Sequence, residues 1–132
     1  MRRLLAAAGF LLLTAAPVSA QIMSIEDYLA VRRGDNADMS ADELNGYLSG
    51  VLDGVISYGT LMQERGSPLF CLPDSEDNRI SVDNLAEALD EMFVQFERDV
   101  PDFAERAERS SMGLATVQLF LLRFPCEEGG GG

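Results

Sequence analysis

The sequence predicts an all-α fold: a single small domain of about five helices, linked internally by one disulfide. Apolar residues recur at three- and four-residue spacing in several segments, which is the pattern of helices packed on a core. No segment shows the strict alternation of a half-buried strand. Apolar residues make up 47% of the 132-residue chain, a content that excludes a disordered acidic tail.

The first twenty residues have the features of a secretory signal peptide. Arg2 and Arg3 precede an apolar run from Leu4 to Ala16, and small residues follow before Gln21. The alternative is an uncleaved anchor, but the run is shorter than the ~20 residues of a spanning helix. We therefore expect a signal peptide (1–20), a helical domain (21–126) and a flexible Gly-rich tail (127–132). The mature chain would be periplasmic, without stable membrane insertion.

Charge and residue inventory exclude several classes of function. Cleavage removes two of the ten arginines and leaves eight against 22 acids, a formal charge of −14. Such a chain repels phosphate backbones, so we expect no nucleic-acid partner. Histidine, the usual general base and zinc ligand, is absent. We expect no catalytic residues, no cofactor and no metal, and hence no enzyme.

Two cysteines, Cys71 and Cys126, lie in the mature chain. An even number in a small exported domain favours a disulfide, and two cysteines allow one intramolecular pairing. Two free buried thiols or an intermolecular bridge are the alternatives. A zinc site is disfavoured because two thiolates without histidine leave the ion half-coordinated.

Helix starts are marked by serine caps. Ser24 opens a short helix that runs to about Arg33, and Ser40 opens a long one from Ala41 to about Glu64. Ser81 caps a third, amphipathic helix, whose acidic side carries Asp83, Glu87, Asp90 and Glu91. A short charged helix from Asp102 to about Arg109 follows. The segment from Met112 to Phe124 is apolar nearly all round, which predicts a buried central helix.

Three glycines four residues apart, Gly46, Gly50 and Gly54, share one face of the long helix. Each costs on the order of 1 kcal/mol relative to alanine, so the face needs a close neighbour to account for them. That neighbour is either the segment 112–124 or a second copy in a homodimer. Asp53 lies among apolar residues, which predicts partial burial and a hydrogen bond from the backbone or from a tyrosine such as Tyr28 or Tyr58. A general base is the alternative for Asp53.

These motifs together resemble the Rap/Tai-type immunity protein family of bacteria. The resemblance rests on Gly46, Tyr47, Gly50 and Asp53 in the long helix, and on Phe70-Cys71-Leu72-Pro73 and Phe124-Pro125-Cys126. It covers roughly residues 41–126. The loop 74–79 is longer than the usual turn of the family, and the mature charge is more extreme.

The resemblance implies a periplasmic antitoxin, dimeric and helical, that occludes the groove of a peptidoglycan amidase effector of type VI secretion. Cys71 and Cys126 would be the family disulfide. The acidic residues Asp83, Glu87, Asp90 and Glu91 would attract a basic rim on the effector, or would serve only solubility. The alternative functions are a small periplasmic acid-stress chaperone, activated as carboxylates protonate near pH ~4, and an orphan protein-binding module.

Overall fold

The structure is a computed structural model that describes residues 22–73 and 80–127. The predicted signal peptide, the loop 74–79 and nearly all of the predicted tail lie outside these residues. Within them the chain forms helices and no strand beyond one antiparallel bridge between Ser24 and Ser111, so the all-α prediction is confirmed. The helices are α1 (Ile25–Arg33), α2 (Ala41–Glu64), α3 (Val82–Asp99), α4 (Phe103–Arg109) and α5 (Met112–Arg123).

Serine caps open four of the helices: the sequence predicted those at Ser24, Ser40 and Ser81, and the cap at Ser111 was not predicted. In each case the serine side chain accepts a hydrogen bond from the backbone N–H three residues further on; these are Ser24, Ser40, Ser81 and Ser111. At the start of α2 the carboxylate of Glu43 also accepts from the Ser40 backbone N–H, at 2.7 Å. That bond lowers the pKa of Glu43 below its usual value. The helix boundaries are therefore set by local hydrogen bonds.

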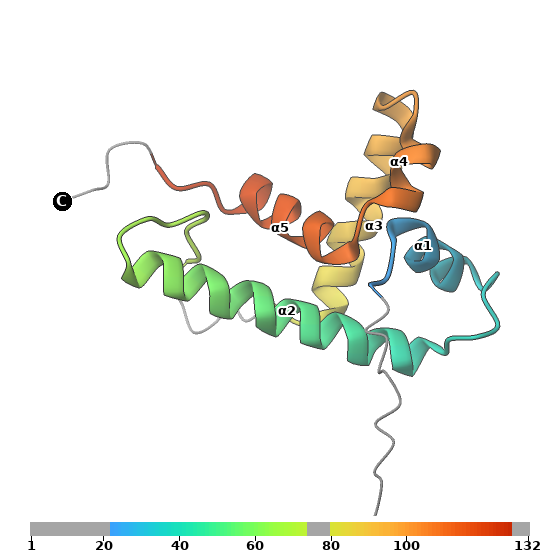
Figure 1. Cartoon of the computed structure of the whole chain (residues 1–132), viewed down its shortest axis with the longest axis horizontal. Coiled ribbons are helices and arrows are strands. Elements are labelled where there is room, and N and C mark those ends of the chain that lie inside the picture. Colours follow the sequence, from blue (N-terminus) through green and yellow to red (C-terminus); the bar gives the residue numbers. More distant parts are fainter. Residues whose placement is uncertain (1–21, 74–79, 128–132) are drawn as a thin grey trace, which may run out of the picture.

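The long helix α2 contacts three of the other helices, α1, α3 and α5 (Figure 1). Helix α5 lies alongside α2, α3 packs against both, and the short pair α1 and α4 packs together beside them. Backbone bonds on either side of the Ser24–Ser111 bridge, Ile25 to Ser110 and Met112 to Met23, hold the start of α1 against the α4–α5 junction. The largest fully buried side chains are Tyr28, Phe70, Phe93, Phe120, Leu48, Leu85, Leu89, Met112 and Thr116.

Helix α5 is only half enclosed, which corrects the prediction of a helix buried all round. One side packs into the core through residues such as Met112, Leu119 and Phe120. The other side leaves Leu114, Leu121 and Leu122 exposed to solvent. The physical reason is the number of layers. Helices α1, α2 and α3 contact α5, and they leave the side with these leucines uncovered.

The segment between α2 and α3 is anchored by Phe70. Its side chain is only 1% exposed and meets the Phe120 ring edge-to-face at 5.1 Å between centroids. The backbone N–H of Cys71 donates to the carbonyl of Phe124 at 2.8 Å. The predicted disulfide joins Cys71 to Cys126 beside this hydrogen bond, so that prediction is confirmed. The segment that follows α2 is thereby tied to the C-terminal end of α5.

The Phe70 ring packs directly against Gly59 of α2, and the first prediction concerns this contact. A Cβ at position 59 would fall inside the van der Waals radius of the Phe70 ring. The buried ring has little room to move, and overpacking of this kind costs about 1–3 kcal/mol. Alanine recovers up to about 1 kcal/mol of that through its better helix propensity. We expect Gly59→Ala to lower the free energy of unfolding, as measured by urea denaturation.

Gly46→Ala is the matched control, since a Cβ there meets no atom within 4 Å. At low protein concentration we expect Gly46→Ala to raise the free energy of unfolding, by up to about 1 kcal/mol. Equal effects of the two alanine substitutions would contradict the role given to Gly59.

The second prediction concerns the disulfide. The bond closes a loop across a sequence separation of 55 residues. In the chain-entropy model a loop of this length is worth about 4 kcal/mol. We expect the double variant Cys71→Ser, Cys126→Ser to lose roughly this amount of stability in urea denaturation. Adding dithiothreitol should destabilise the natural chain and leave the variant unchanged. A natural chain insensitive to the reductant would contradict the prediction.

Candidate functional site

The described part of the chain offers no cluster of metal-ligating side chains. Among residues 22–73 and 80–127, no set of three or more Cys, Asp or Glu side chains is placed to hold a metal ion. Both cysteines are engaged in the disulfide. Nor does any helix in these ranges have the length and apolar character needed to cross a bilayer. The features that could bind a partner lie on the surface of the domain.

The acidic side of α3 is divided by the structure into two parts. Asp90 is half-buried, and Glu91 forms an ion pair with Arg123 at 3.0 Å. Asp83 and Glu87 are exposed, and neither forms an ion pair or side-chain hydrogen bond within the described residues. Of the four acids predicted to face a partner, Asp83 and Glu87 are thus the two whose carboxylates remain open to one.

Asp90 of α3 accepts hydrogen bonds from two side chains of α1 and so links the two helices. The Tyr28 hydroxyl, which is fully buried, donates to Asp90 Oδ1 at 2.7 Å. Arg32, one turn further along α1, donates from Nε to Asp90 Oδ2 at 3.0 Å. Burial, together with the bond to Asp90, raises the pKa of the Tyr28 hydroxyl above its usual range. Asp90 therefore has a structural role in the contact between α1 and α3.

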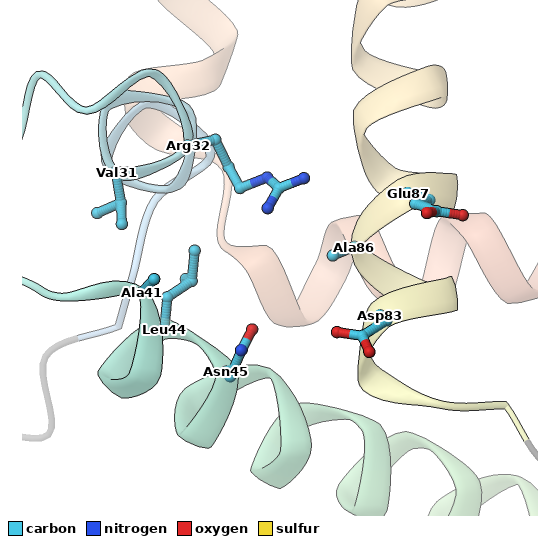
Figure 2. A pocket seen from close by; sticks show the side chains of 8 residues that line it. All are labelled: Val31, Arg32, Ala41, Leu44, Asn45, Asp83, Ala86 and Glu87. Atoms are coloured by element: carbon cyan, nitrogen blue, oxygen red, sulfur yellow. The ribbon is translucent and has the colours of Figure 1, made fainter.

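Asp83 and Glu87 line an open pocket between α1, α2 and α3 (Figure 2). Its volume is about 440 Å³. Arg32 extends from α1 toward α3 across the pocket, and Asp83 points into it from α3, opposite Asn45 of α2. Because Arg32 is already paired with Asp90, the two carboxylates give the pocket a net negative charge. The pocket is therefore suited to a cationic side chain.

The family-signature residues of α2 lie mostly on its solvent side. Gly46, Gly50 and Asp53 are exposed, while Tyr47 is partly buried against the edge of the core. A Cβ added at Gly46, Gly50 or Gly54 would meet no atom within 4 Å. Packing against the segment 112–124 is therefore wrong as the reason for these glycines. The expected burial of Asp53 is also wrong, and the buried Tyr28 donates to Asp90 instead.

A second hollow lies beside these glycines and was not predicted from the sequence. It is an apolar groove of about 320 Å³ between α2 and α5. Gly50, Gly54 and Tyr58 line it from α2, and Gly113 and Val117 from α5. The signal for it was present in the sequence, because a helix apolar all round in so small a domain has too few neighbours to cover it.

The fold defines a class, the small disulfide-linked helical domain with a strongly acidic surface. Comparisons with protein-family models, with curated proteins and with solved structures find no match for this chain. The interpretation of its function therefore rests on the two surfaces just described.

The third prediction tests the bond between Tyr28 and Asp90. Tyr28→Phe removes the donor and leaves a half-buried carboxylate with one partner fewer. We expect the free energy of unfolding at neutral pH to fall by about 1–3 kcal/mol. Since the pKa of Tyr28 is raised by folding, its contribution is complete below the ordinary tyrosine pKa of about 10 and is lost as the pH rises above it.

Urea denaturation at neutral and alkaline pH checks both parts of this expectation. The stability difference between the natural chain and Tyr28→Phe should shrink above pH ~10. Tyr58→Phe is the control, because Tyr58 is half exposed and forms no side-chain hydrogen bond in the described part of the chain. A difference that is constant with pH would contradict the role of the Tyr28 hydroxyl.

Proposed function

We propose that the chain is a periplasmic immunity protein that binds and inhibits a peptidoglycan amidase effector of type VI secretion. The resemblance to the Rap/Tai-type family motivates the choice of target. The helical fold and the Cys71–Cys126 disulfide are compatible with it. The proposal concerns binding rather than catalysis, and its mechanism is the occlusion of the partner's active-site groove.

The observation that carries the proposal is a pair of carboxylates at the pocket between α1, α2 and α3. Neither forms an ion pair or a side-chain hydrogen bond within the described residues. Asp83 and Glu87 lie one turn apart on α3, and Arg32, which lines the same pocket, is paired with Asp90. An arginine or lysine at the rim of the amidase groove would find two carboxylates there. Long-range attraction between an acidic inhibitor and a basic rim also speeds association.

The test begins with the chain produced with its own N-terminus and purified in oxidised form. At neutral pH it is used to capture proteins from an envelope extract of the source bacterium, which mass spectrometry then identifies. We expect one amidase in a stoichiometric complex, and inhibition of that amidase by the purified chain. Capture of many unrelated proteins at low pH alone would contradict the proposal and favour the acid-stress chaperone.

The fourth prediction assigns the contact. We expect the double variant Asp83→Asn, Glu87→Gln to slow association with the amidase at least tenfold and to reduce its dependence on salt. The matched control is Glu64→Gln, Glu108→Gln, which removes the same charge from exposed positions on α2 and α4. Equal slowing by the two double variants would show that net charge, rather than this pocket, governs binding.

A further inference from the structure

An exposed apolar ridge on α5 adjoins the groove between α2 and α5. Leu114, Val117 and Leu121 fall on one side of α5, because they lie three and four residues apart. Leu114 is 57% exposed and Leu121 is 42% exposed. Val117 also lines the groove, so the ridge and the groove adjoin. We call this surface the α2/α5 face; its residues are Gly50, Gly54, Tyr58, Gly113, Leu114, Val117 and Leu121.

The α2/α5 face leaves apolar atoms in contact with water. A Cβ added at Gly50 or Gly54 would meet no atom within 4 Å, although glycine is a poorer helix former than alanine. The two glycines therefore deepen the groove, and Leu114 and Leu121 stay exposed beside it. Because the burial of such a surface is favourable, the face is suited to an apolar segment of polypeptide.

The first described residues lie at one end of this face. The backbone N–H of Met112 donates to the carbonyl of Met23 at 2.9 Å, so Met23 lies beside the first turn of α5. The next residue of α5, Gly113, lines the groove. Ile22 shares a neighbouring hollow with Tyr47, which precedes Gly50 by about one turn of α2. The chain before residue 22 therefore continues from the end of the groove at which α5 begins.

The segment before residue 22 has the length and composition that the face requires. Residues 4–16, the apolar run of the predicted signal peptide, contain six leucine and phenylalanine side chains and no charge. We call them the leader segment. The link from residue 16 to residue 22 spans up to roughly 20 Å when extended. The face extends along α2 for only about 12 Å, from Gly50 to Tyr58. The leader segment can therefore reach all of it.

Charge also favours contact between the leader segment and the domain. Arg2 and Arg3 precede this segment, and residues 1–21 contain no acid. All 22 acids of the chain consequently lie in residues 22–132. The N-terminal part is therefore attracted to the domain, whereas any other part of so acidic a chain is repelled by it. None of the residues of the α2/α5 face is charged, so apolar contact there buries no carboxylate.

From these observations we propose that the leader segment, before its expected cleavage, occupies the α2/α5 face of its own chain. Its bulky side chains enter the groove over Gly50 and Gly54 and cover the ridge on α5. Removal of the leader then uncovers an apolar surface that the precursor hides. The inference does not depend on the proposed function, because the acidic pocket is lined from α2 by other residues, Ala41, Leu44 and Asn45.

The test uses tryptophan fluorescence, since the natural chain contains no Trp. Phe10→Trp and, in a second variant, Leu12→Trp each place one probe in the leader segment. The full chain is made by cell-free translation without membranes, so that the leader stays attached, and is then oxidised. We expect at least one probe to emit at shorter wavelength than in urea and to be quenched by acrylamide at least about fivefold less. This protection should be unchanged on dilution, because the contact lies within one chain.

Three substitutions in the domain show whether the α2/α5 face provides the protection. Gly54→Leu fills the groove and Leu114→Gln makes the ridge polar; each should raise quenching at least about threefold, and circular dichroism checks that each variant is folded. Val94→Gln is the matched control. Val94 on α3 is as exposed as Leu114, at 57%, and lies outside the α2/α5 face. We expect Val94→Gln to leave the quenching unchanged.

Four results would overturn the proposal. The first is full access of acrylamide to both probes. The second is protection that disappears on dilution, which would assign the contact to another copy of the chain. The third is protection that neither Gly54→Leu nor Leu114→Gln weakens, and the fourth is protection that Val94→Gln weakens as much as Leu114→Gln does.

Discussion

The contact of the Phe70 ring with Gly59 determines how helices α2 and α5 are held together. The ring contacts α2 at Gly59 and α5 at Phe120, so one side chain spans both helices. The Cys71–Cys126 disulfide and the bond from Cys71 N–H to the Phe124 carbonyl secure the same segment to the end of α5. Because α2 and α5 are positioned by this contact, so is the groove between them, whose lining includes Phe70.

The acidic side of α3 shows how one pattern in the sequence serves two purposes in the fold. Asp90 lies where the buried hydroxyl of Tyr28 needs an acceptor, and its charge is balanced by Arg32. Arg32 lines the same pocket as Asp83 and Glu87, but its guanidinium is paired with Asp90. This ion pair strengthens the contact of α1 with α3 and leaves Asp83 and Glu87 without an ion-pair partner among the described residues.

Local features of the fold and the one possible disulfide could be predicted, whereas the other long-range contacts could not. The serine caps and the bounds of α2 depend on hydrogen bonds within three or four residues, so they can be recognised in the sequence. The role of Asp90 depends on Tyr28, 62 residues away in the chain. Likewise the exposure of Asp53, Gly50 and one side of α5 depends on how many helices surround them. Composition and periodicity indicate that an apolar helix in so small a domain has few neighbours, but they do not say which of its sides stays uncovered.

The acidic pocket and the apolar groove, which α2 lines in part, differ in the force that would hold a partner, and their dependence on salt distinguishes them. Binding at Asp83 and Glu87 draws on attraction between opposite charges, so added salt weakens it. The groove between α2 and α5 is lined by apolar residues and glycines, so a contact there would draw on apolar burial, which salt screening does not weaken. The difference in salt dependence follows from the carboxylates at the pocket and the uncharged lining of the groove.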